Sequence, residues 1–317
     1  MPSILRYAAR VTRKPVLGNK ADQKRTVAIV GAGSLASALA PALAEAGYTI
    51  TEIIARARTQ SRRRLRSLER ARTLAKKVGA RAATVENAAL DAALLWFCVP
   101  DREISAAASA LAGRGPSGMR FAFHSSGALL SGELGALRKA GVAVASVHPL
   151  MTFVAQVRPS LAGVPFALEG DAAATKLARR IVGDLGGESF LLLARRKAAY
   201  HAWATMTSPL LLAYLVTLEE AAREAGLARE DARRMSLPII RQTLENYRNC
   251  GPEQSFSGPF IRGDAETVAK HLAILGKQPR TRAVYVALAR TVLARLPVEN
   301  GKQLRRLLDE RGRVKAW

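Results

Sequence analysis

Short apolar runs alternate with helical stretches over the first two thirds of the chain. The runs are rich in β-branched and aliphatic residues, have the length of buried strands, and lie at 26–30, 48–55, 92–99, 120–123 and 142–147. Stretches with helical periodicity lie between them at 34–46, 58–78 and 103–112. This alternation predicts right-handed β-α-β units in a parallel sheet. A further strand, helix and strand, at 164–169, 172–185 and 189–193, should extend the same layer by one more unit.

From about residue 197 the pattern changes to long helices, and no strand signal returns. The predicted helices are 197–225, 229–248, 265–275, 281–296 and 301–311. We therefore expect an α/β domain over 26–193 and an all-α domain over 194–317. Residues 1–25 show no sustained periodicity, carry seven basic residues against one acidic residue, and are predicted to form a flexible basic arm.

A glycine-rich turn follows the first predicted strand, in the pattern Gly31-x-Gly33-x-x-Ala36. Gly31 allows a tight turn, Gly33 lets backbone N–H groups approach a pyrophosphate, and Ala36 lets the helix pack closely on the sheet. The N–H groups of Ser34 and Leu35 would face the phosphates from the helix N-terminus. Strand, turn and helix together predict a Rossmann-type, doubly wound parallel sheet that binds a dinucleotide. The alternative is a glycine turn in an α/β fold that binds no cofactor.

Arginines follow the second predicted strand, where an NAD enzyme usually has an acidic residue. The acid nearby, Glu52, comes too early in the strand, whereas Arg56 and Arg58 follow the strand end and Arg62 comes soon after. Guanidinium groups suit the 2′-phosphate of NADP. We therefore predict NADP, with NADPH preferred over NADH. The alternative is that the arginines form only a solvated helix face, which we accept for most of the basic residues in 62–72.

Polar residues also follow the later strands, at the sheet edge where ligands bind in such folds. Val99, Pro100 and Asp101 are predicted to lie beside the nicotinamide ribose; a second interpretation, compatible with the first, is that Asp101 caps the next helix.

His124 and His148 each come directly after a strand and are expected to act in catalysis. Ser125 and Ser126 are expected to bind substrate. A lone histidine is more often a surface or core residue, but two at equivalent strand ends favour a site. We do not favour a serine nucleophile, because that role needs a base within hydrogen-bond reach.

Four polar residues share one face of the first long, mostly apolar helix: Lys197, His201, Thr205 and Ser208. Such a stripe on a buried helix should face a cleft or a partner, and a solvent-facing stripe is the alternative. We expect Lys197 and His201 to donate a proton and to bind substrate, and Ser208 to bind substrate. Pro209 should kink the helix.

A loop runs into a later helix at 258–272. Asp264 is a good N-cap, and Glu266 complements the helix dipole. Arg262 has no such structural explanation, so we expect it to hold a substrate carboxylate as a bidentate fork.

Composition narrows the class of protein. The 49 basic and 25 acidic residues give a net charge of +24, which favours anionic partners such as phosphorylated cofactors. Aromatic residues make up 5% of the chain, which counts against stacking on single-stranded nucleic acid, and no motif that reads nucleic acid is present. We therefore do not predict nucleic-acid binding. No histidine pair has the short spacing typical of metal ligands, so no metal site is predicted.

Membrane insertion and secretion are not expected. No apolar run reaches the ~18 residues of a spanning helix, and the N-terminus lacks the apolar segment of a secretory signal. Two cysteines, Cys98 and Cys250, are too few for a disulfide framework. These features favour a cytoplasmic protein.

The motifs together resemble the Rossmann-like oxidoreductase-type proteins whose C-terminal half is domain of unknown function 2520. The matching segments are 31–36, 99–101, 124–128, 148–150, 200–202 and 258–272. This family is similar to the β-hydroxyacid and 6-phosphogluconate dehydrogenases. The resemblance implies a 6-phosphogluconate dehydrogenase-like helical domain that forms a homodimer. It also implies an NADP-dependent reduction of a small anionic oxo-acid or imine-like substrate between the two domains.

The same resemblance implies that Lys197 donates the proton, with His201 at the position where the dehydrogenases carry asparagine. This departure leaves an alternative open, namely an NADP(H)-binding sensor or regulatory protein without turnover.

Overall fold

The computed structural model describes residues 25–55, 62–115, 118–155 and 157–312. The chain divides into two compact units, of which the first ends at Ala204 and the second begins at Thr205. This boundary lies inside a helix and beyond the expected domain limit at 193. The predicted arm lies outside the described residues except for Arg25.

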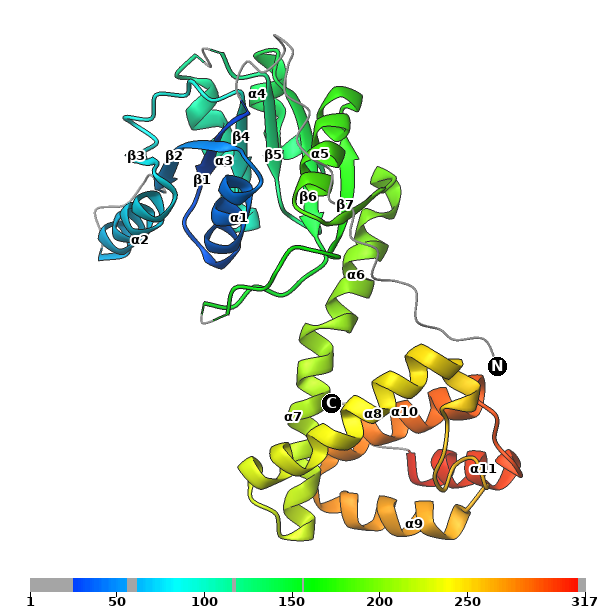
Figure 1. Cartoon of the computed structure of the whole chain (residues 1–317). Coiled ribbons are helices and arrows are strands. Elements are labelled where there is room, and N and C mark those ends of the chain that lie inside the picture. The colour runs from blue at the N-terminus through cyan, green and yellow to red at the C-terminus, as the bar shows by residue number, and fades with distance from the viewer. Residues whose placement is uncertain (1–24, 56–61, 116–117, 156, 313–317) are drawn as a thin grey trace, which may run out of the picture. The chain divides into compact units, whose positions relative to one another are not determined.

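An eight-stranded sheet forms the centre of the first unit, as far as the structure describes it (Figure 1). Its strands are β1 (Thr26–Val30), β2 (Thr49–Ala55), β3 (Arg81–Thr84), β4 (Leu94–Phe97), β5 (Phe121–His124), β6 (Ala143–Pro149), β7 (Pro165–Gly170) and β8 (Glu188–Leu191). They lie in the order β3-β2-β1-β4-β5-β6-β7-β8. Strands β1 to β6 are parallel, so their carboxyl ends share one edge of the sheet. Strands β2 and β3 extend the sheet on one side of β1, and β4 to β6 extend it on the other, so the strand order changes direction between β1 and β4. In doubly wound sheets, ligands bind beside such a switch point. The predicted α/β fold class is confirmed.

The sheet is not parallel throughout. β7 pairs with β6 in the antiparallel sense, whereas β7 and β8 are parallel to each other and joined by a helix. A parallel neighbour for β6 would need a crossover connection, usually a helix. The described part of 150–164 forms no helix, only an isolated bridge between Val154 and Val157. The expected β-α-β unit is therefore present as β7, α5 and β8. The expectation that its strands run parallel to the rest of the sheet is wrong.

Helices cover both faces of the sheet. They are α1 (Ser34–Glu45), α2 (Arg62–Val78), α3 (Asp101–Ala112), α4 (Gly135–Lys139) and α5 (Ala172–Asp184). Apolar residues of α1, α2 and α5 pack on one face, and those of α3 and α4 pack on the other. In β1, Val27 and Ile29 face the first core and Ala28 and Val30 the second, as alternation along a strand requires.

The long helix predicted over 197–225 is interrupted. The chain forms α6 (Lys197–Thr207) and α7 (Pro209–Ala222), and Ser208 lies between them with non-helical backbone angles. Pro209 explains the break, because its ring cannot follow a continuous helix. The predicted kink is therefore present, and Ser208 lies outside the helix that carries Lys197.

In its described residues, the second unit consists of helices and the loops that join them, with no strand. After α7 come α8 (Arg229–Gln254), α9 (Ala265–Ile274), α10 (Pro279–Arg295) and α11 (Gly301–Gly312). Its apolar core joins α9, α10 and α11, with Leu272, Leu293 and Leu304 among the buried residues. No helix in the described residues is both long and apolar enough to cross a bilayer.

Candidate functional site

The glycine turn has the shape that the sequence predicts. Gly31 has a φ of +106°, and a Cβ built there would lie 2.4 Å from the carbonyl oxygen of Cys98. Its N–H donates to the carbonyl of Ile54, which joins the turn to β2. Gly33, the N-cap of α1, is extended, and a Cβ there would meet no described residue within 4 Å. Open space therefore lies above the helix N-terminus where a side chain would otherwise stand.

This space fits a pyrophosphate. The first N–H groups of a helix have no intrahelical acceptor, and the helix dipole favours an anion there. The first turn of α1 carries no acidic residue, and Ser34 and Leu35 provide its first N–H groups. Ala36 is completely buried, so the helix lies close to the sheet. The residues present are thus suited to hold the phosphates of a dinucleotide.

The end of β2 carries no acid that could bind a ribose. Glu52 is buried, and its carboxylate accepts hydrogen bonds from the backbone N–H of Ala89 and from Arg81. It therefore has a structural role, in agreement with its early position in the strand. Arg56 and Arg58 lie outside the described residues, as does the side chain of Arg62.

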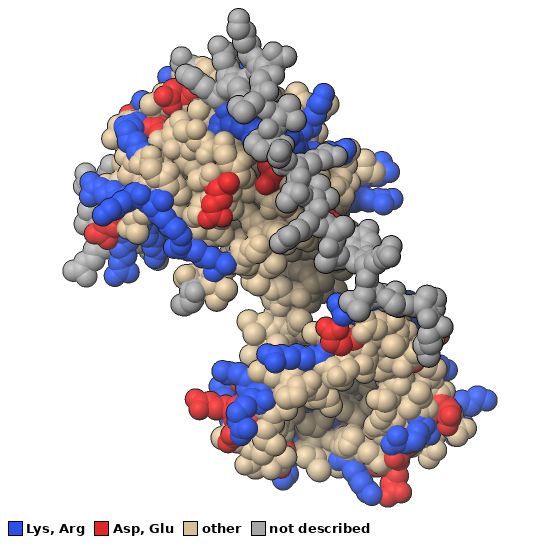
Figure 2. Space-filling model, in the orientation of Figure 1, with Lys and Arg blue, Asp and Glu red and all other residues tan. Residues whose placement is uncertain are grey.

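Basic residues cover the outer face of α2. Figure 2 shows lysine and arginine side chains gathered over this helix, and the exposed ones include Arg66, Arg70, Arg72, Lys76 and Lys77. Its other face is apolar and packs on the core. Most of the helix therefore matches the solvated-face interpretation.

The end of β4 differs in one detail from the prediction. Pro100 is the N-cap of α3, and Asp101 is the first helical residue, so the predicted alternative of an Asp101 cap is wrong. Instead, the Asp101 carboxylate accepts a hydrogen bond of 2.7 Å from the hydroxyl of Ser126. Val99 is half-buried and Pro100 is exposed. This loop is therefore tied to the loop that follows β5.

His124 is completely buried at the end of β5. Its Nδ1 accepts a hydrogen bond of 3.1 Å from the backbone N–H of Ser126, so its proton lies on Nε2, 3.0 Å from the carbonyl oxygen of Leu130. Burial is the main cause that lowers the pKa of His124 to about 4. Both ring nitrogens are thus engaged by backbone groups, and the ring stays neutral at physiological pH.

The two serines after His124 differ in their contacts. The Ser126 hydroxyl donates to Asp101 and accepts from the backbone N–H groups of Ala128 and Leu129, which fills its hydrogen-bonding capacity. The Ser125 hydroxyl accepts a hydrogen bond of 2.9 Å from the indole of Trp96, which leaves its own hydrogen for another acceptor.

Lys197 is buried at the start of α6, with 3% of its surface exposed. Its ammonium donates to the hydroxyl of Ser146 on β6 and lies 3.9 Å from a carboxylate oxygen of Glu169 on β7. Burial lowers the pKa of Lys197 to about 8, while the charges of Glu169 and Asp101 oppose that shift. The side chain can therefore be charged or neutral near physiological pH.

His148 lies beside two residues of α6. Its Nδ1 is 2.7 Å from the hydroxyl of Tyr200, and its ring is 6.5 Å from that of His201. A Cβ on Gly127 would lie 2.8 Å from Nε2 of His148 and 2.7 Å from the ring of His201, so glycine is needed for this close approach. Burial, followed by the charge of Lys197, lowers the pKa of His148 to about 4. Burial raises the pKa of Tyr200 to about 12, so Tyr200 keeps its proton.

The first unit thus brings together most of the predicted catalytic residues at the carboxyl edge of the sheet. Sequence reasoning assigned no role to Tyr200, Ser146 or Glu169. The sequence does contain a signal for two of them. Ser146 lies two residues before His148 and therefore on the same face of its strand, and Glu169 is an acid at the end of an apolar run.

The remaining predicted residues belong to the second unit. Ser208 is the N-cap of α7 without a side-chain hydrogen bond to that helix. Asp264 caps α9 as predicted, because its carboxylate accepts hydrogen bonds from the backbone N–H and the hydroxyl of Thr267. Arg262 is exposed.

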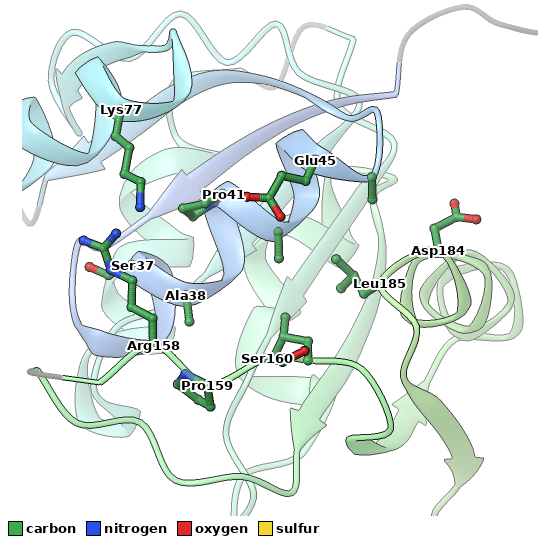
Figure 3. Close-up of a pocket in the computed structure, with 13 residues that line it drawn as sticks. Ser37, Ala38, Pro41, Glu45, Lys77, Arg158, Pro159, Ser160, Asp184 and Leu185 are labelled. Carbon is green, nitrogen blue, oxygen red and sulfur yellow. The ribbon is translucent and has the colours of Figure 1, made fainter. Parts of the chain in front are cut away.

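A cavity of about 520 Å³ lies beside α1, between this helix, the segment 158–161 and the end of α5 (Figure 3). Lys77 and Arg158 converge near Ser37 at one end, and Glu45 and Asp184 also line it. Its lining includes neither the glycine turn nor the histidines. It is therefore separate from the candidate site.

Two domain families match this sequence. Residues 12–149 match the Rossmann-like domain, and residues 164–292 match the domain of unknown function DUF2520. Together these segments contain the glycine turn and the residues placed around His124, His148 and Lys197. No curated protein matches the sequence significantly.

Solved structures with the same fold cover nearly the whole chain. A Bacteroides fragilis protein provisionally named an NADP oxidoreductase is 22% identical, with a TM-score of 0.67 over 85% of this chain and 98% of its own. A Thermotoga maritima protein is 24% identical, with a TM-score of 0.64 over 90% and 100%. The imine reductase of Myxococcus stipitatus, in complex with NADP+, is 16% identical, with a TM-score of 0.58 over 89% and 99%. The fold and the two domain matches agree: this chain belongs to the proteins that join a Rossmann-like domain to a DUF2520 domain.

Proposed function

We propose that this protein is an NADP-dependent oxidoreductase that reduces a small oxo-acid or imine-like substrate. One observation carries the proposal: a buried lysine and a histidine–tyrosine pair lie at the sheet edge that also holds an open glycine turn. The names of the similar structures, an NADP oxidoreductase and an imine reductase with NADP+, support the same class of reaction.

The cofactor would be held by the glycine turn and its neighbours. Gly31, Gly33 and the N–H groups of Ser34 and Leu35 would bind the pyrophosphate. Arg56 and Arg58 would bind the 2′-phosphate and so favour NADPH over NADH. When bound, NADPH supplies the hydride.

Lys197 is the proposed proton donor. Its pKa of about 8 keeps a large fraction of the ammonium protonated at neutral pH, yet lets it release a proton far more readily than an exposed lysine. The ammonium would also attract an anionic substrate.

The histidines have different proposed roles. His148 and His201 flank Gly127 and would hold substrate oxygens, with Tyr200 orienting His148. His124 and Ser126 have their polar atoms engaged by protein groups, so we propose that they position the loop after β5. Ser125 keeps a hydroxyl hydrogen for substrate, and Arg262 and Ser208 remain proposed substrate ligands.

We further propose that the protein forms a homodimer through the second unit. Large apolar side chains on α7 and α8 are exposed, among them Leu210, Leu212, Ile239 and Leu244. An exposed apolar surface of this kind marks an interaction site, and a second copy would cover it.

The test is an absorbance screen at the NADPH band with 2-oxo acids and cyclic imines, comparing NADPH with NADH. Oxidation of NADPH that depends on one of these substrates supports the proposal. Saturable NADPH binding without oxidation over the whole panel would contradict the enzymatic role and favour the sensor alternative.

A further inference from the structure

The Lys197 ammonium lies in a pocket made by residues from other elements. Ser146 on β6 accepts a hydrogen bond from it, and the Ser146 hydroxyl in turn donates to the carbonyl of Ser126 at 3.0 Å. Glu169 on β7 lies 3.9 Å away. Both serines are buried, and the Glu169 side chain is 12% exposed, so these contacts are largely shielded from water.

Glu169 is itself held in place. One carboxylate oxygen accepts a hydrogen bond of 2.7 Å from the backbone N–H of Ser131, and the other accepts one of 2.8 Å from its hydroxyl. Arg138 donates to the same hydroxyl at 3.2 Å. A carboxylate held by two such donors cannot swing towards solvent without losing both bonds.

We infer that Glu169 is a positioning residue for Lys197: it holds the ammonium at the sheet edge and keeps it protonated. The inference deepens the proposed function, because it rests on Lys197 as the proton donor. Nothing in the motif pattern of the chain assigns a role to Glu169.

The charges around Lys197 support this role. Among the described residues, four titratable groups from four elements interact electrostatically with it: Glu169 on β7, Asp101 on α3, His124 on β5 and His148 on β6. Both histidines have pKa values lowered to about 4 and are neutral near pH 7, so they add no positive charge there. Of the two carboxylates, Glu169 is the nearer partner by its ion pair, and it makes the larger contribution to holding the pKa of Lys197 up against burial.

The experiment measures the titration of Lys197 directly. Protein grown with ¹³C-labelled lysine is titrated by NMR, and the Cε resonance of Lys197 is identified as the one absent from Lys197→Arg. We expect a midpoint near 8 in the native chain. Glu169→Gln keeps the shape but removes the charge, and should lower the midpoint by about one pH unit. Glu188→Gln, an exposed glutamate on β8, should leave it unchanged.

Each outcome decides the matter. An unchanged midpoint in folded Glu169→Gln overturns the inference. If that variant fails to fold, Glu169→Asp takes its place: its shorter side chain withdraws the carboxylate from the ammonium, so a lower midpoint supports the inference and an unchanged one contradicts it. The alkaline limb of the kcat/KM profile should move with the midpoint. If Glu169→Gln lowers the midpoint of Lys197 but leaves the alkaline limb of the kcat/KM profile in place, the role of Glu169 is supported and Lys197 is not the donor. The two proposals can therefore fail separately.

Discussion

At the scale of single residues, burial determines the chemistry of the candidate site. Burial lowers the pKa values of Lys197, His124 and His148, so a lysine that would be fully charged in water titrates near pH 8 and two histidines stay neutral. Only Lys197 therefore changes its protonation within the physiological range among these three groups.

Replacing Lys197 tests the donor role. Lys197→Ala should lower kcat by about 10²- to 10⁴-fold, the usual range for losing a general acid, while NADPH affinity changes little. Steady-state kinetics and a fluorescence titration measure the two effects. Lys176→Ala, at an exposed lysine on α5, should change neither. Equal losses in turnover and NADPH affinity would contradict the assignment.

His124 makes stability depend on pH. Its pKa is near 6.5 in the unfolded chain and about 4 in the folded protein, so the unfolded state binds more protons between these values and stability falls as the pH is lowered through this window. We expect the first unit to lose about 2 kcal/mol between pH 7 and pH 5 from this residue alone.

Urea unfolding followed by the fluorescence of buried Trp96 measures the effect. His124→Asn cannot titrate and should show a smaller loss over the same pH range, whatever its starting stability. His271→Asn, in the second unit, should retain the full loss. An identical pH dependence in His124→Asn and the native chain would refute this explanation.

At the scale of elements, the turn from β1 into α1 contains one glycine that the fold requires and one that we propose the cofactor requires. Gly31 is needed because of its positive φ and its contact with a backbone carbonyl, whereas Gly33 has an ordinary backbone conformation and open space around it. The two glycines should therefore respond differently to substitution.

Gly31→Ala should destabilise the first unit by about 1–2 kcal/mol or more, because alanine avoids this backbone region and its Cβ would clash with Cys98. Gly33→Val should leave the stability nearly unchanged but abolish NADPH binding, because its side chain would fill the space proposed for the pyrophosphate. Thermal unfolding and an NADPH titration of both variants provide the test. Unimpaired NADPH binding by Gly33→Val would show that the dinucleotide lies elsewhere.

Most elements of the fold follow from hydrophobic periodicity. The strands that lead to Gly31 and His124 were predicted because they are short apolar runs followed by turn residues. The short strand β3 and the helix α4 were missed, since four residues of β3 and five of α4 are too few to show a period. The direction of β7 was also missed, because periodicity identifies a strand but not its partner.

The candidate site was predictable only in part. His124, His148 and Lys197 stand out because a polar group in or beside an apolar segment requires an explanation. Their partners were not predictable: Ser146 and Glu169 meet Lys197 across 51 and 28 positions of the chain, and only the register of β6 and β7 brings them together.

At the scale of the whole molecule, the exposed apolar surface of the second unit bears on assembly. Leu212 on α7 is 62% exposed and Ile239 on α8 is 68% exposed. We expect the native chain to sediment as a dimer in analytical ultracentrifugation and Leu212→Glu/Ile239→Glu as a monomer, because burying an unpaired carboxylate is unfavourable. Leu191→Glu, on the exposed edge of the first unit, should remain dimeric. A monomeric native chain would contradict the proposed homodimer.

The proposed reaction depends on binding of NADP by the first unit, through its glycine turn and the arginines after β2. The most direct test is a fluorescence titration of the native chain with NADPH and, in parallel, with NADH. We expect saturable binding of NADPH that is at least about tenfold tighter than that of NADH, a difference of about 1.4 kcal/mol. No saturable binding of either dinucleotide would contradict it.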